Sequence, residues 1–174
     1  MGGRRRHKIV YPLGKVQTRL ISASISKELR LTKNPLKANC HCGQVQVVIE
    51  TAPEFLQDCN CSLCSNSGGV WGYFNPAQVK VSGATKGYSR SDVTDPAVDI
   101  RFCENCGATT HWVLTAAYIA EIGKNEQMGV NMRLFNSDDL SGIELRFPDG
   151  KNWSGDTAYG YRRPNVILGD DYIL

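Results

Sequence analysis

The sequence predicts a mainly β protein, and three observations support this fold class. Short runs rich in β-branched and aromatic residues recur along the chain after Lys37. Turn-forming pairs such as Asn75-Pro76 and Ser82-Gly83 separate these runs. No segment shows the sustained 3.6-residue apolar repeat of a long amphipathic helix. With 174 residues, 41% of them apolar and 21% charged, a single globular domain with a buried core is expected.

The predicted strands lie, in chain order, at residues 44–50, 70–74, 78–82, 98–103, 109–114, 118–123 and 129–134. The segment 60–66 is the exception, because closely spaced cysteines there favour a tight knuckle or a single helical turn. Trp71, Tyr73 and Phe74 are expected to pack in the core, with the alternative that one of them lines a pocket. Ser67-Gly68-Gly69 fits a flexible rim of a site and an ordinary turn equally well.

Three parts are predicted along the chain. Residues 1–36 form a basic N-terminal extension, residues 37–160 form the β domain that carries every cysteine, and residues 161–174 form a C-terminal tail that packs on this domain. Residues 4–8 carry four positive charges against a net charge of +3 for the whole chain, so the folded part is expected to be nearly neutral. A solvated tail is the favoured interpretation of the basic run, over nucleic-acid binding or a nuclear address.

Two classes of protein are disfavoured by the apolar pattern. The longest apolar stretches fall far below the roughly 20 residues of a membrane-spanning helix. The N-terminus also lacks the apolar core of a secretory signal. We therefore expect a cytoplasmic protein without a membrane partner, in a compartment where thiols stay reduced. The sequence does not indicate an oligomeric state.

The seven cysteines form three short clusters at Cys40 and Cys42, at Cys59, Cys61 and Cys64, and at Cys103 and Cys106. Neighbours spaced by one or two residues present convergent sulfurs to one ion, so clustering favours metal over disulfides in a reducing compartment. An odd total also leaves any all-disulfide scheme with one unpaired thiol. Buried cysteines serving only as small apolar residues would be scattered through the strands. The pattern therefore predicts zinc binding by residues 37–160.

A closed structural zinc site is predicted from Cys40, Cys42, Cys103 and Cys106. Tetrahedral Zn²⁺ needs four ligands, and thiolate sites are often assembled from two short-spaced pairs in distant parts of the chain. Gly43 and Gly107 follow the two pairs directly, and glycine permits the positive-φ turn that brings backbone N–H groups toward the sulfurs. Such a zinc would join the start of the β domain to its middle and supply folding energy.

A second zinc, open for catalysis, is predicted at Cys59, Cys61 and Cys64. Three protein ligands are typical of catalytic rather than structural zinc. The alternative is that Asp58, His41 or His111 closes the site as a fourth ligand. His41 lies between two ligands of the other site, which is expected to turn it away. His111 is expected on a strand, where a histidine satisfied in the core or at the surface is the commoner case.

Three thiolates would also restrict the chemistry at this second zinc. They overcompensate the double positive charge of the metal, so its Lewis acidity is weaker than that of a three-histidine zinc. Hydrolysis is therefore not the first expectation. A soft centre of this kind suits another thiolate, which predicts a small thiol-containing molecule as its partner.

The motifs resemble those of the glutathione-dependent formaldehyde-activating enzyme family, whose domain is also found in centromere protein V. The similar segments span residues 38–149 and comprise the three cysteine clusters, each with its neighbours, and the run from Gly129 to Leu134. The resemblance implies a distorted β-sandwich of small antiparallel sheets. It also implies structural zinc at Cys40, Cys42, Cys103 and Cys106, and catalytic zinc at Cys59, Cys61 and Cys64.

By the same resemblance, the chain is expected to be a zinc-dependent carbon–sulfur lyase acting on a thiol adduct such as S-hydroxymethylglutathione. No motif identifies the group that would bind a glutathione carboxylate, and the candidates are Arg90, Arg101, Arg133 and Arg146. One alternative is an enzyme that uses the open zinc for addition, elimination or dehydration in a biosynthetic pathway. The other is a non-catalytic zinc module for protein or chromatin binding.

Overall fold

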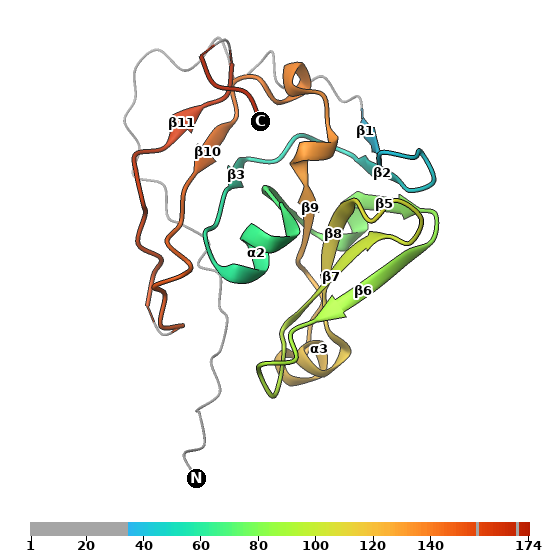
Figure 1. The fold of residues 1–174 in the computed structure, drawn as a ribbon, viewed down its shortest axis with the longest axis vertical. Helices are drawn as coiled ribbons and strands as arrows, with labels where there is room; N and C mark the ends of the chain where they lie inside the picture. The colour runs from blue at the N-terminus through green and yellow to red at the C-terminus, as the bar shows by residue number, and fades with distance from the viewer. Residues whose placement is uncertain (1–34, 156, 170) are drawn as a thin grey trace.

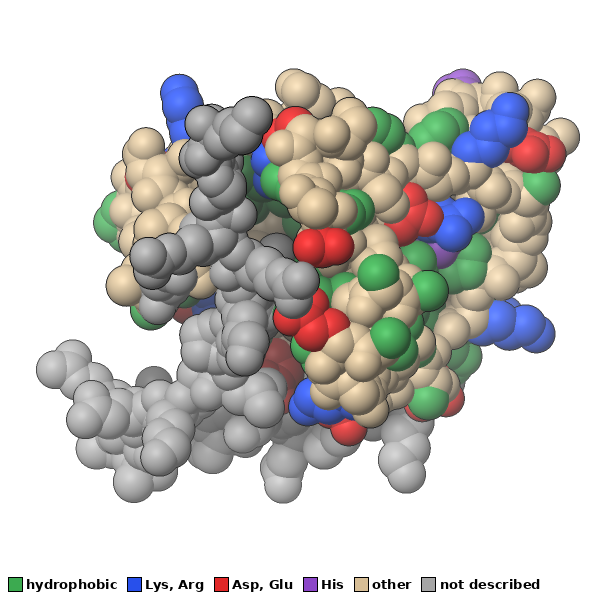
Figure 2. Space-filling model, turned by 90° about the horizontal axis from the view of Figure 1, so that it is seen from below, with side chains coloured by type: hydrophobic (Ala, Val, Ile, Leu, Met, Phe, Trp, Pro, Cys, Tyr) green, Lys and Arg blue, Asp and Glu red, His purple; other side chains and the backbone are tan. Residues whose placement is uncertain are grey.

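The structure is a computed structural model that describes residues 35–174 except residues 156 and 170. The basic run at residues 4–8, and nearly all of the extension predicted at residues 1–36, lie outside the described residues. No helix in the described part of the chain is long and apolar enough to cross a membrane. Charged side chains of both signs are interspersed on the face shown in Figure 2, in keeping with the small net charge.

Two sheets form the framework (Figure 1). The larger has eight strands in the spatial order β11 (Val166–Ile167), β10 (Glu144–Arg146), β3 (Phe55–Gln57), β4 (Trp71–Phe74), β9 (Met128–Asn131), β8 (Thr109–Leu114), β7 (Val98–Cys103) and β6 (Thr85–Ser89). The smaller has three, in the order β1 (Leu36–Asn39), β2 (Gln46–Ile49) and β5 (Val79–Ser82). Their strands pair antiparallel, except that β3 and β10 are parallel. The predicted mainly β fold with antiparallel sheets is confirmed.

Short helices join the strands. The α-helices are α2 (Ser62–Ser67) and α3 (Ala116–Ile122), and the 3-10 turns are η1 (Pro76–Gln78), η2 (Met132–Leu134) and η3 (Ser137–Leu140). The single helical turn predicted around residues 60–66 is confirmed as α2. The run predicted as a strand at 129–134 is a strand only to Asn131 and then becomes η2.

The core lies on both faces of the large sheet, because successive side chains along a strand point to opposite sides. On one face, Phe74 and Val130 pack with Val47 and Ile49 of the small sheet. On the other, Trp71, Ile100, Trp112 and Leu114 pack against Leu63 and Cys64 of α2 and against Tyr118 and Ile119 of α3. The small sheet and the two helices therefore cover opposite faces. Burial of Trp71 and Phe74 confirms their predicted place in the core.

The strand predicted at residues 118–123 is wrong, because this segment forms α3. The side chain of Thr115 accepts a hydrogen bond from the Tyr118 backbone N–H at 3.2 Å and caps the N-terminus. Ala116 and Ala117 favour the helix, and Gly123 ends it with φ of 73°. The side chains of Tyr118 and Ile119 both pack against the apolar cluster on the sheet. Their β propensity is outweighed by caps at both ends.

Candidate metal centres

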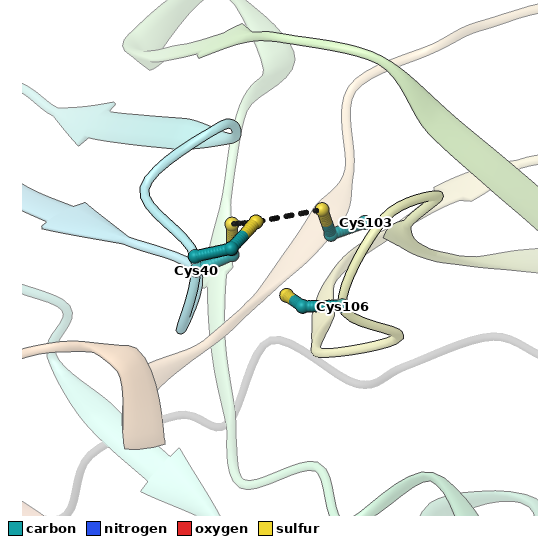
Figure 3. Close-up of side chains that lie close together, drawn as sticks. Cys40, Cys103 and Cys106 are labelled. Carbon is teal, nitrogen blue, oxygen red and sulfur yellow. Dashed lines mark hydrogen bonds between the residues drawn. The ribbon is translucent and has the colours of Figure 1, made fainter.

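Four cysteines meet between the two sheets, at the ends of two strand-to-turn loops. Cys40 directly follows β1 and Cys103 ends β7, while Cys42 and Cys106 lie in the turns beyond. Figure 3 shows the labelled side chains directed at one another. The Sγ atoms are 3.5 Å apart for Cys40 and Cys42 and 3.7 Å apart for Cys42 and Cys103. Tetrahedral zinc with Zn–S bonds of about 2.3 Å places sulfurs about 3.8 Å apart, so these four atoms fit that ion.

The two loops share one local design. Gly43 and Gly107 have φ of 79° and 72°, which confirms the predicted positive-φ turns. The Gly43 N–H donates to the Cys40 carbonyl, and the Gly107 N–H donates to the Cys103 carbonyl, each at 2.9 Å. The turn after Cys40 also directs the Val45 N–H to the Cys40 Sγ at 3.2 Å. Backbone donors of this kind offset the negative charge of a thiolate ligand.

Burial and charge differ among these four sulfurs. Cys40 and Cys103 are buried, whereas Cys42 is exposed. A hydrogen bond from the Asn105 side chain, and a second from the Gln44 backbone, lower the pKa of Cys42 to about 6. These donors favour the thiolate form of Cys42, which is the form that binds a metal.

Cys59, Cys61 and Cys64 meet within a single six-residue segment that leads into α2. The Cys61 side chain caps the helix by accepting from the Cys64 backbone N–H at 3.5 Å. At the other end Gly68, with φ of 65°, donates to the Cys64 and Ser65 carbonyls. This cap bends the chain toward β4, and a Cβ on Gly69 would meet the Trp71 ring at 2.1 Å. The three sulfurs lie within 4.8 Å of one another, and all three residues are half-buried.

Each sulfur of this group accepts at least one N–H. The Cys61 backbone N–H points to Cys59 Sγ at 3.5 Å, and the Cys64 backbone N–H points to Cys61 Sγ at 3.5 Å. The third donor is the indole Nε1 of Trp71, 3.3 Å from Cys64 Sγ. Trp71 was predicted from the sequence only as a core residue or pocket wall. No spacing signal connects it to Cys64, because the contact depends on how α2 packs on β4.

The thiols of this group perturb one another strongly. Hydrogen bonds from Cys59 and then from Cys64 lower the pKa of Cys61 to about 2. Conversely, hydrogen bonds with Cys59 and Cys61, together with burial, raise the pKa of Cys64. Loss of the first proton is therefore easiest at Cys61 and hardest at the more buried Cys64. Binding of a soft cation would replace the two remaining protons.

None of the three predicted candidates for a fourth ligand joins this group within the described residues. The carboxylate of Asp58 faces Arg162 at 3.5 Å. His41 is exposed in the loop of the other cluster. His111 is buried beside Thr110, with its Nδ1 2.9 Å from the hydroxyl oxygen. Because Trp112 points to the α2 face, the preceding His111 points to the opposite face.

A cleft of about 540 Å³ separates α2 from strands β6, β7 and β8. Its walls include Ser62, Asn66 and Ser67 of α2. Tyr88, Arg90, Asp92, Ile100, Phe102, Gly107 and Thr109 lie opposite. Ser67 thus lines the site, while Gly68 serves as an ordinary helix cap.

Among the four arginines considered from the sequence, Arg90 is the one that lines this cleft. Its guanidinium donates to both oxygens of Asp92, at 2.9 and 2.6 Å, and interacts electrostatically with Cys61. Arg101 instead pairs with Asp99 at 2.8 Å, and Arg146 pairs with Glu144 at 2.6 Å. Arg133 is exposed on η2.

A further polar side chain was not singled out by sequence reasoning. Asn131 is buried at the end of β9, and its Oδ1 accepts from the backbone N–H groups of Val70 and Arg133, each at 3.2 Å. Its Nδ2 donates to the Thr109 carbonyl at 3.0 Å. Val70 leads out of the three-cysteine segment and Thr109 leads out of the Cys106 turn. Asn131 therefore ties together the backbones that follow the two cysteine groups.

The fold and the two sulfur clusters define a class of β-sheet protein able to hold metal at two cysteine-rich sites. Residues 35–138 match the family described as "Glutathione-dependent formaldehyde-activating enzyme", and the chain belongs to this family. The family predicted from the motifs is thereby confirmed. No curated protein matches the chain. Among solved structures, a Rhodobacter sphaeroides protein matches with 26% identity and a TM-score of 0.47, over 62% of this chain and 97% of that chain.

Proposed function

We propose that this chain is a zinc-dependent carbon–sulfur lyase-type enzyme that acts on a small thiol adduct such as S-hydroxymethylglutathione. The observation that carries the proposal is the placement of three convergent sulfurs, without a fourth protein ligand among the described residues, in a segment whose Ser62 and Leu63 line a cleft together with Arg90. The family name supports the substrate, because it specifies glutathione and formaldehyde.

The donor sets fit zinc at both clusters. Cys40, Cys42, Cys103 and Cys106 would hold a structural ion, and Cys59, Cys61 and Cys64 would hold a catalytic one. At the second cluster, zinc would supply a soft Lewis acid that lowers the pKa of a substrate thiol. Sulfur, rather than oxygen or nitrogen, is the donor in both sets, which favours zinc over magnesium or calcium.

The residues around the cleft would bind and orient the substrate. Arg90 offers a planar pair of N–H donors suited to a carboxylate, with Asp92 as the counter-ion that the substrate would compete with. Trp71 contacts the Cys64 sulfur through its indole N–H, and Leu63 offers the cleft an apolar side chain. In the lyase direction the carbon–sulfur bond of the adduct breaks, the sulfur keeps the electron pair as thiolate, and the hydroxyl proton passes to water. Positioning is the main contribution of the chain in either direction.

Metal analysis and thiol titration test this function. The purified chain is expected to contain two zinc ions, and Cys61→Ser is expected to contain one. In the cobalt-substituted protein, glutathione should shift the sulfur-to-metal charge-transfer bands, and Cys61→Ser should abolish the shift. Exchange of formaldehyde with glutathione, followed by NMR, should be faster with the wild-type enzyme than with Cys61→Ser. An absence of any response to thiols would contradict the enzyme and favour an interaction module.

The role of Arg90 is tested with two thiols. Arg90→Gln should weaken glutathione binding about tenfold and leave 2-mercaptoethanol binding unchanged, because the latter has no carboxylate. Arg133→Gln is the matched control, since Arg133 is exposed and lies outside the residues that line the cleft. Equal affinity for both thiols in the wild type would retain the enzyme but argue for a substrate other than a glutathione adduct.

A further inference from the structure

One side of the three-cysteine group is formed by residues that follow the range matched by the family. That match ends at residue 138, whereas β10 begins at Glu144. Figure 1 shows β10 beside β3, the strand that leads into the cysteine segment. The two strands are parallel, with Arg146 opposite Gln57. Because parallel strands run in the same direction, the chain that leaves β10 must travel beside the chain that carries Cys59 and Cys61.

The register of the strands continues beyond their ends. Arg146 and Gln57 are partners, and the pair three residues further on, Asp149 and Asn60, is joined by a side-chain hydrogen bond of 2.7 Å. The Asn60 Oδ1 accepts from the Lys151 backbone N–H at 2.9 Å. Asn60 lies between two of the three cysteines. Both ends of its amide are therefore held by residues 149–151.

The residue before Cys59 is held by the same C-terminal part. The Asp58 backbone N–H donates to the Arg146 carbonyl at 2.9 Å. Arg162 donates to the Asp58 carbonyl and also faces its carboxylate. Cys59 precedes α2 and receives no support from helical hydrogen bonds, so these contacts on either side of it determine where its sulfur lies.

The backbone of Gly150 lies directly against the Cys59 sulfur. A Cβ at this position would lie 2.3 Å from Cys59 Sγ and 3.3 Å from Cys61 Cβ. Gly150 is not among the glycines with positive φ, so its backbone also suits alanine. The requirement for glycine here is therefore space for a sulfur, not a special turn.

We propose that residues 149–151 are a positioning element for the metal at Cys59, Cys61 and Cys64, with Gly150 seated against the Cys59 sulfur and Asp149 fastening Asn60. This inference rests on the proposed metal site and adds to it a wall outside the matched family range. Contacts that orient ligands in this way commonly change metal affinity by about 10- to 100-fold.

Gly150→Ala tests the proposal, with Gly160→Ala as the matched control. Gly160 lies in the same C-terminal part, has no positive φ, and a Cβ there meets nothing within 4 Å. Cobalt affinity is measured separately for the two clusters by competition with a chelator, on the full-length protein. Gly150→Ala should weaken the three-cysteine site at least tenfold and leave the four-cysteine site unchanged, whereas Gly160→Ala should match the wild type at both.

Asn60→Ala provides an independent measurement, because it removes both contacts with residues 149–151 without adding bulk. It should also weaken the three-cysteine site selectively. Wild-type affinity in Gly150→Ala, or in Asn60→Ala should Gly150→Ala not fold, would overturn the positioning role. These outcomes are distinct from a failure of the proposed function, in which the wild-type chain itself would bind no second metal.

Discussion

The two cysteine groups are built from similar motifs but in different ways. The four-cysteine group joins two loops that are 61 residues apart at their closest pair, and two of its cysteines are buried. The three-cysteine group comes from six consecutive residues; all three cysteines are half-buried, and Ser62 and Leu63 between them line a cleft. A metal at the first would link separate parts of the fold. A metal at the second would sit on one segment and remain within reach of a small molecule.

We expect the sequence separation that a cluster spans, more than its residue types, to determine whether a bound metal stabilises the fold or reacts with a ligand. The cluster that spans the ends of β1 and β7 would close a long loop of chain when it binds a metal, so its loss should destabilise both sheets. The cluster at α2 closes almost no loop, so its loss should leave the sheets paired.

The largest expected effect separates the two groups by folding. Cys103→Ser should leave the chain insoluble or unfolded, because structural zinc contributes up to about 10–16 kcal/mol on the scale of zinc-finger peptides. Cys61→Ser should remain soluble with near-normal far-UV circular dichroism and thermal unfolding. Normal folding of Cys103→Ser together with unfolding of Cys61→Ser would contradict this difference between the two groups.

A smaller loss is expected when the link between the two groups is removed. Asn131→Ala deletes three hydrogen bonds and leaves the Val70 N–H buried without its acceptor, so the free energy of unfolding should fall by about 3 kcal/mol. Urea unfolding of the variant and the wild type measures this fall in the free energy of unfolding. Asn136→Ala is the control, since its Oδ1 caps an exposed turn with one bond. Equal losses of stability in the two variants would show that Asn131 does not stabilise the link between the two cysteine groups.

Acid should lower the free energy of unfolding through His111, which lies on β8 of the large sheet. Burial, and secondly the charge of Arg101, lower the pKa of His111 to about 4. The unfolded chain therefore binds more protons than the folded chain between about pH 6.5 and pH 4, and stability falls as the pH is lowered through this window. Between pH 7 and pH 5 the loss should be about 2 kcal/mol.

His111→Gln removes this contribution while metal release by acid remains. Urea unfolding at pH 7 and pH 5 should therefore show a smaller pH-dependent loss in the variant than in the wild type. Identical losses would assign the acid sensitivity to the cysteine groups alone.

The smallest effect concerns one hydrogen bond at the three-cysteine group. Trp71→Phe keeps an aromatic ring in the core but removes the indole N–H donor to Cys64. Metal affinity of this site should fall about tenfold while the four-cysteine site is unchanged. Chelator competition on the cobalt protein measures both. Trp112→Phe, on the same face, is the control for lost packing.

The sequence by itself was sufficient for the clustering of the cysteines and for the β class of the fold. Both are local: ligand spacing within six residues and alternation within a strand are set by the neighbouring residues. The tight knuckle or single helical turn predicted at residues 60–66 rested on the same local spacing, and the segment forms α2. The helix at residues 116–122 could also have been predicted, since Thr115 and Gly123 are capping residues. The β propensity of Tyr118 and Ile119 led instead to the wrong prediction of a strand.

The distant residues that surround the three sulfurs could not be predicted from the sequence. The strands β3 and β10 have three residues each, too few for a recognisable pattern, yet their parallel pairing brings Gly150 to Cys59. The contact of Trp71 with Cys64 likewise depends on α2 packing across β4. Among the four arginines considered from the sequence, Arg90 is set apart by its place in the lining of the cleft. Each of these contacts depends on which strands pair and on which face of the sheet a side chain lies. Both are properties of the whole sheet, so they cannot be read from the spacing of the residues involved.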